Sequence, residues 1–191
     1  VGIYTFRAPL IASLEDMITT DMFVTEDSDQ FNPGLDVETQ FPTIHAVSQG
    51  QEVTDINQFI LDKGAIFIAN RSVDWWPFCK NQLVQLTEIS DQFTDLGLSI
   101  VTLTYDSVEM LKEVQEDYEI DYTLLHDEEV TIIDALGVRN IDYDPGHRFY
   151  GIPYPGIFIV NSDGVITAKF AEESYRDRPD LADVIAAAAA L

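Results

Sequence analysis

The chain has 191 residues, and its 10 Lys and Arg against 34 Asp and Glu give a formal net charge of −24. That length suits one domain with one core, and hydrophobic residues make up 46% of the chain, enough to fill it. So negative a surface repels phosphate backbones and anionic lipid, which argues against nucleic-acid binding. The single cysteine, Cys79, excludes an intrachain disulfide. Because disulfides are the sign of an oxidising compartment, the cysteine content does not indicate where the protein is located.

The N-terminal segment differs from the rest of the chain. Residues 1–14 are apolar apart from Arg7, and they resemble the end of a removed anchor or signal sequence. This favours an extracytoplasmic or membrane-anchored protein with the anchor upstream of residue 1. The competing interpretation is an amphipathic helix on a cytoplasmic domain. We expect a helix over 8–22 and divide the chain into residues 1–34, a helix and connector, and residues 35–191, the main domain. No stretch of the chain is apolar for long enough to cross a membrane.

Hydrophobic patterning in the main domain predicts alternating strands and helices. In chain order we expect two short strands joined at Gln49-Gly50, a buried strand at 65–70, a helix from Pro77 to Gly97 and a buried strand at 98–105. The next helix is capped by Asp106 or Ser107, and its apolar stripe consists of Met110, Leu111, Val114 and Tyr118. We then expect a strand at 122–125, a helix at 129–136, a loop at 140–155, a hairpin of 157–160 and 165–170, and a helix from about Pro179. Strands separated by helices imply a mixed central sheet with helices on both faces.

Active sites of such folds gather at the carboxyl ends of the strands. The strand at 65–70 ends in the segment 71–80, which leads into the long helix. A thiol at that helix start would have its thiolate stabilised by the free backbone N–H groups and the helix dipole.

Three motifs resemble one family: RSVDWWPFCKNQL at 71–83, the loop and hairpin at 135–166, and FAEESYRDRPDLADVIAAA at 170–188. Together they look like the alkyl hydroperoxide reductase/thiol-specific antioxidant class of peroxiredoxin-like proteins. The resemblance runs from about Gly34 to Leu191 and implies a thioredoxin-like fold of the α/β class, extended by the N-terminal helix and a hairpin. It also places Pro155 where the thioredoxin fold carries its cis-proline, and it implies thiol-dependent reduction of peroxides or disulfides.

The family's active-site segment commonly reads Trp, then Cys-Pro-x-Cys. Here Trp76 stands where the resemblance places the attacking cysteine. A tryptophan forms neither a thiolate, a sulfenic acid nor a mixed disulfide, so the family's nucleophile is lost. Cys79 matches the second cysteine of the motif. It is interpreted either as a lone redox thiol beside Lys80 or as a buried small hydrophobe on the stripe with Leu83.

Other candidates surround this segment. Trp75, Pro77, Tyr154 and Pro155 would place aromatic and proline side chains at one end of the sheet, as a binding surface or a packed cap. His147 and Arg148, in the loop, would bind an anion or assist proton transfer, or else form a solvated pair. Residues 126–129, His-Asp-Glu-Glu, are interpreted as a charged turn and not as a metal site, and no cofactor is expected.

Three hypotheses follow. The first is an impaired redox enzyme that acts through Cys79, with a thiol reductant or thioredoxin-like partner. The second is an inactive binding module built around Trp76. The third is an active enzyme in which Trp76 is an isolated replacement, reversible by Trp76→Cys.

Overall fold

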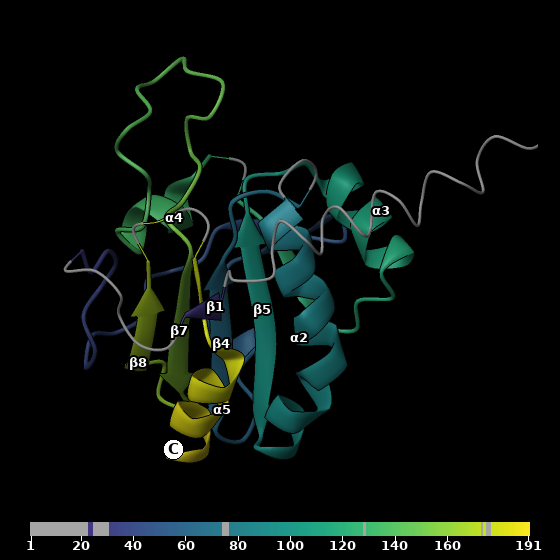
Figure 1. Ribbon diagram of the computed structural model, residues 1–191, viewed down its shortest axis with the longest axis vertical. Coiled ribbons are helices and arrows are strands. Elements are labelled where there is room, and N and C mark those ends of the chain that lie inside the picture. Colours follow the sequence, from purple (N-terminus) through teal and green to yellow (C-terminus); the bar gives the residue numbers. More distant parts are fainter. Residues whose placement is uncertain (1–22, 25–30, 74–76, 128, 173, 175–176) are drawn as a thin grey trace, which may run out of the picture.

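The computed structural model describes residues 23–24, 31–73, 77–127, 129–172, 174 and 177–191 (Figure 1). Its strands are β1 (Phe23–Val24), β2 (Ala46–Ser48), β3 (Gln51–Val53), β4 (Gly64–Ala69), β5 (Leu98–Thr104), β6 (Thr123–His126), β7 (Gly156–Asn161), β8 (Ile166–Ala171) and β9 (Arg178–Pro179). Its helices are η1 (Ile56–Gln58, a 3-10 helix), α2 (Pro77–Asp95), α3 (Val108–Asp117), α4 (Thr131–Ala135) and α5 (Leu181–Ala189).

Within the described residues, seven strands form one mixed sheet in the order β3-β2-β6-β5-β4-β7-β8. The central strands β4, β5 and β6 are parallel, and the other pairs are antiparallel. The parallel core follows from the sequence, because β4 and β5 are apolar runs buried on both faces and helices connect them. A second, two-residue pairing joins β1 to β9 in parallel.

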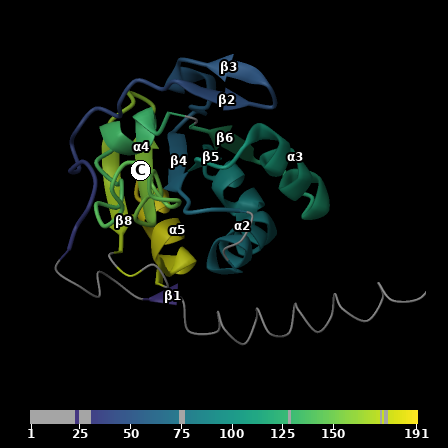
Figure 2. The ribbon, with the colours of Figure 1, turned by 90° about the horizontal axis from the view of Figure 1, so that it is seen from above.

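Helices cover both faces of the sheet (Figure 2). One face packs against α2, α3 and α5, where Leu83, Leu111 and Val184 meet Ile66 and Ile159. The other face packs against α4 and the segment that carries η1. Because β4 contributes Ile66 and Ile68 to one core and Phe67 to the other, it forms the centre of the domain.

The predicted elements are largely confirmed. Pro77 begins α2, and Gly97 follows its end in a left-handed conformation with φ of 79°. The hairpin turn forms at residues 161–164, where Asn161 Oδ1 accepts hydrogen bonds from the amides of Asp163 and Val165. The expected helix over 8–22 lies outside the described residues, and no helix among the described residues has the length and apolar character that a membrane crossing requires.

Two expectations at α3 were only partly correct. The helix cap is Ser107, whose hydroxyl accepts from the amide of Met110, and not Asp106. Tyr118, which we placed on the apolar stripe, is exposed at the C-terminal end of the helix, whereas Leu111 and Val114 are buried.

The helix that we predicted at 129–136 is shorter in the structure, where α4 begins at Thr131 and ends at Ala135.

Candidate functional site

The carboxyl end of β4 continues directly into the segment 71–80, where the sequence predicts the active site. Asn70 extends the parallel pairing by donating its amide to the carbonyl of Leu103 over 2.8 Å. Ser72 and Val73 follow and are buried. Both donate hydrogen bonds to the carboxylate of Asp106, which lies at the carboxyl end of the neighbouring strand β5. The segment is thus fixed at the carboxyl end of the central strands, just before residues 74–76, which lie outside the described residues.

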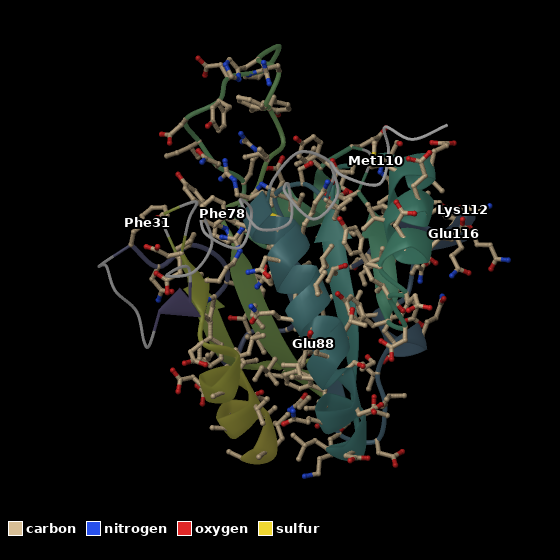
Figure 3. All side chains as sticks on the ribbon, turned by 45° about the vertical axis from the view of Figure 1, so that its right-hand side comes forward. Phe31, Phe78, Glu88, Met110, Lys112 and Glu116 are labelled. Carbon is tan, nitrogen blue, oxygen red and sulfur yellow. The ribbon has the colours of Figure 1, made fainter. Side chains whose placement is uncertain are left out.

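Cys79 lies in the first turn of α2 and has no solvent-exposed surface. The Nη2 of Arg178 donates a hydrogen bond to its Sγ over 3.2 Å. Neighbouring Phe78 is also buried, at the N-terminal end of α2 and close to the base of the long loop (Figure 3). The thiol is therefore buried, but it faces a guanidinium cation and not a purely apolar pocket.

Arg178 is fully buried and makes several contacts at once. Its Nε donates to Oε1 of Gln82 over 3.0 Å, and its Nη1 donates to the carbonyl of Asp177 over 2.7 Å. The backbone of Arg178 belongs to β9, which pairs with β1. The segment that precedes α5 thus places the cation over the first two turns of α2.

A second buried arginine, Arg71, lies in the same region. Its Nη1 donates to the carbonyl of Pro153 over 3.3 Å, and its side chain is hydrogen-bonded to Tyr143. Burial lowers the pKa of the Arg71 guanidinium, and the charge of Arg178 acts in the same direction, whereas Cys79 and Tyr143 raise it. Arg71 thus lies close enough to Arg178 and Cys79 for their charges to act on its guanidinium.

The side chain of Asn70 is fully buried, and neither its amide oxygen nor its amide nitrogen has a hydrogen-bond partner in the described part of the chain. Asn70 begins a formal glycosylation triplet, Asn70-Arg71-Ser72, but in the folded domain that side chain is inaccessible. A buried amide of this kind is destabilising, and Thr102 Oγ1 on the neighbouring strand β5 also lacks a partner in the described part of the chain.

The predicted binding residues do not all meet at this site. Trp75 and Trp76 lie outside the described residues, and Pro77 begins α2. Tyr154 is buried, and its ring meets that of Phe31 edge-on with the centroids 4.8 Å apart. Pro155 is buried, and its carbonyl accepts from the amide of Glu172.

The expectation of a cis-proline at Pro155 is not met. The described residues contain no cis peptide bond, so the bond before Pro155 is trans. Pro155 nevertheless stands immediately before β7, as the resemblance implied, and its carbonyl ties β7 to the strand end at Glu172.

The long loop contributes to the site differently from the prediction. Arg148 is exposed, with its guanidinium over the ring of Phe149 at 4.3 Å. His147 stacks on Tyr143 with the ring centroids 5.0 Å apart. Because Tyr143 bonds to Arg71, the loop reaches the site through this tyrosine, whereas Arg148 packs on its own neighbour in the loop.

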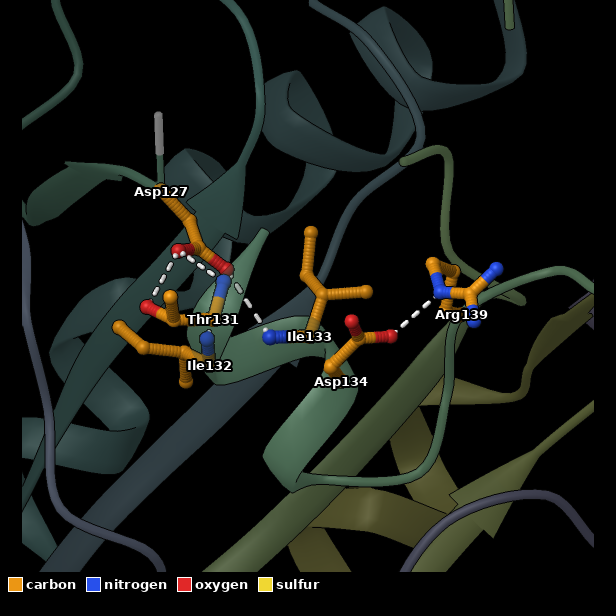
Figure 4. A network of polar contacts seen from close by, with 6 residues as sticks. All are labelled: Asp127, Thr131, Ile132, Ile133, Asp134 and Arg139. Atoms are coloured by element: carbon orange, nitrogen blue, oxygen red, sulfur yellow. Dashed lines mark hydrogen bonds and ion pairs between the residues drawn. The ribbon is translucent and has the colours of Figure 1, made fainter. Parts of the chain in front are cut away.

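The interpretation of residues 126–129 as a charged turn was wrong for two of its residues. His126 ends β6 with its Nδ1 2.6 Å from the carbonyl oxygen of Asp106. Asp127 is fully buried and accepts from the amides of Thr131, Ile132 and Ile133 (Figure 4). Asp127 therefore holds the start of α4. Among the described residues, no group of three or more His, Cys, Asp or Glu is placed to bind a metal ion.

Sequence reasoning missed Arg71, Arg178, Gln82 and Asp106 as neighbours of the site. One signal was available for the arginines, because Lys and Arg are scarce in this chain and these two lie within the family motifs. Gln82 and Asp106 gave no comparable signal, since polar residues on a helix and at a strand end are common.

The fold and the thiol at the start of α2 define a peroxiredoxin-like protein with the thioredoxin fold. Residues 37–169 match the AhpC/TSA family, and the chain belongs to that family.

Individual relatives agree with this assignment. The chain is 28% identical over 134 residues to "Peroxiredoxin 2" of Sulfuracidifex metallicus, a match covering 66% of this chain and 59% of that protein. It is 25% identical over 150 residues to "Putative peroxiredoxin bcp" of Haemophilus influenzae, covering 76% of this chain and 92% of that protein. The match thus spans little more than half of the archaeal relative and nearly all of the bacterial one.

Solved structures show the same fold. Peroxidoxin BcpB from Mycobacterium tuberculosis superposes with a TM-score of 0.70 at 16% identity, covering 85% of this chain and 99% of that one. A peroxiredoxin-like protein from Aquifex aeolicus gives a TM-score of 0.68 at 20% identity, over 82% of this chain and 88% of that one.

Proposed function

We propose that this chain is a thiol-dependent peroxide reductase of the AhpC/TSA family, impaired by Trp76, whose remaining chemistry runs through Cys79. The observation that carries the proposal is the hydrogen bond from Arg178 to the sulfur of Cys79. A cation that donates to sulfur favours negative charge there, and the start of α2 adds its dipole in the same sense. The family placement supports peroxide as the oxidant.

The reaction balances with one cysteine and an external thiol. The Cys79 thiolate attacks a peroxide oxygen, the O–O bond breaks, and the leaving alkoxide takes a proton to become an alcohol. The resulting sulfenic acid condenses with a reductant thiol, which releases water and forms a mixed disulfide. A second reductant thiol then restores Cys79 and leaves as part of a disulfide. The family generally uses thioredoxin-like reductants, and we propose one here.

The same geometry accounts for an impaired rate. Cys79 has no exposed surface, so peroxide reaches it only when the structure around the start of α2 opens locally. Arg178 and Leu83 are buried as well, so such openings are rare. Slow turnover is expected, limited by opening and by the absence of a thiol at position 76.

The test compares the wild type with Cys79→Ser and Cys79→Ala in a peroxide-consumption assay with excess dithiothreitol. The wild type should consume peroxide faster than the reductant blank, and both variants should fall to the blank. Equal consumption by the wild type and the variants would refute a role for Cys79. In that case the inactive binding module would be the better account.

A further inference from the structure

Beyond the thiol itself, the structure assigns to Asp106 the role of a positioning residue for the segment that leads to Trp75 and Trp76. The assignment rests on the proposed function only for the location of the site, because the contacts that carry it do not involve Cys79.

The carboxylate of Asp106 is buried and accepts three short hydrogen bonds from two elements. Its Oδ1 accepts from the Ser72 hydroxyl over 2.8 Å, and its Oδ2 accepts from the Val73 amide over 2.7 Å. The same Oδ2 accepts from the Thr104 hydroxyl over 2.7 Å. One buried carboxylate at the end of β5 thus holds the chain that leaves β4, immediately before residues 74–76.

The Val73 amide depends on this carboxylate as its acceptor. A buried N–H group without an acceptor is destabilising, so the segment would rearrange to satisfy the Val73 amide if the carboxylate were removed. The backbone of Asp106 is also fixed, since Nδ1 of His126 lies 2.6 Å from the carbonyl oxygen of Asp106. The ends of the neighbouring strands β5 and β6 therefore stabilise the position of the segment that leaves β4.

A change in this segment has a specific spectroscopic signature. The chain has two tryptophans, Trp75 and Trp76, and they follow closely on the residues that Asp106 holds. Tryptophan fluorescence excited at the red edge, where tyrosine does not absorb, therefore reports on this segment alone. Loss of a distant structural contact would not alter it while the domain stays folded.

The experiment measures acrylamide quenching of tryptophan emission in the wild type, Asp106→Ala, Asp106→Asn, Ser72→Ala and Ser107→Ala. Asp106→Ala should change the quenching constant by about twofold or more, because the segment loses its buried anchor. Asp106→Asn should stay close to the wild type, since its carbonyl oxygen can face the Val73 amide while its amino group faces the Ser72 oxygen. Ser107→Ala, which removes the α3 cap from the adjacent residue, is the control for general destabilisation and should leave quenching unchanged.

Wild-type quenching in a folded Asp106→Ala would overturn the assignment, as would an equal change in Ser107→Ala. If Asp106→Ala fails to fold, Ser72→Ala decides, because it removes the hydroxyl that donates to the carboxylate. A change in its quenching supports the assignment, and wild-type quenching overturns it. These outcomes do not depend on peroxide turnover, so an inactive wild type would refute the proposed function without deciding this assignment.

Discussion

Arg178 and Cys79 are 99 positions apart in the sequence, yet the guanidinium of one donates a 3.2 Å hydrogen bond to the sulfur of the other. This contact joins the segment before α5 to the first turn of α2. It gives a buried thiol a cationic neighbour, one of the two features, with partial exposure, that reactive cysteines share. On the proposed function, the same buried side chain both polarises the thiol and helps to cover it.

Arg178→Met tests that double role. The substitution keeps side-chain length but leaves Oε1 of Gln82 and the sulfur of Cys79 without their donor, and should lower the free energy of unfolding by about 1–3 kcal/mol. Arg178→Lys should recover part of this loss, because a lysine keeps the charge but not the planar fork. Urea unfolding followed by circular dichroism measures both. A methionine variant as stable as the wild type would contradict the contact's role.

Trp76→Cys tests the loss of the family's nucleophile. The resemblance places the attacking thiol at this position, and nucleophiles account for several orders of magnitude in rate, so peroxide consumption should rise by about a hundredfold or more. Trp75→Cys is the matched control, since it adds a thiol one position away from the motif. Equal gains in both variants, or none in Trp76→Cys, would show that the position is not what limits the rate.

The pH dependence of stability tests Asp127. Burial raises the pKa of this carboxyl above its usual 3.8, although the three α4 amides and the Thr131 hydroxyl act in the opposite direction. The folded chain then keeps the proton to a higher pH than the unfolded chain does. Stability should therefore fall as pH rises from the unfolded value through the folded one, and stay level above it.

Asp127→Asn cannot titrate and supplies the reference for that effect. The difference in unfolding free energy, wild type minus variant, should decline as the pH is raised from about 3 to about 7 in urea titrations. A difference that grows with pH would show that the helix-start amides prevail over burial. The variant also keeps one acceptor oxygen, so both proteins should remain folded throughout.

Two glycines test the packing of the sheet. Gly64 begins β4 with φ of 148°, and a Cβ there would lie 1.9 Å from the carbonyl oxygen of Val160. Gly64→Ala should cost several kcal/mol, because backbone of the neighbouring strand must shift. Gly50→Ala meets nothing within 4 Å, and its φ of 79° should cost only about 1 kcal/mol. Thermal unfolding of both variants distinguishes them, and equal losses would contradict the packing at β4.

The sequence predicted those parts of the fold that depend on local pattern. The run at 65–70 indicated a strand buried on both faces, and Pro77 and Gly97 marked the long helix, because these signals lie within the element itself. The buried arginines escaped notice for the opposite reason. Nothing near Arg178 in the sequence indicates burial, since its partner Cys79 comes from another part of the chain.

Two polar residues show where local interpretation fails. Asp106 and Ser107 are both good helix caps, and the choice between them depends on Ser72 and Val73, which draw the carboxylate away from the helix. Asp127 lies in an acidic run that resembles a solvated turn, but the free amides of α4 bury it. In each case a tertiary hydrogen bond determined the role.

The most direct test of the account is the intact mass of the protein after exposure to stoichiometric peroxide, followed by peptide mapping. We predict that Cys79 gains one oxygen as sulfenic acid, and that adding a small thiol converts this to a mixed disulfide at the same residue. The Cys79→Ser variant should show neither change. An unmodified Cys79 after peroxide exposure, with the domain folded, would contradict the claim that this thiol carries the family's chemistry.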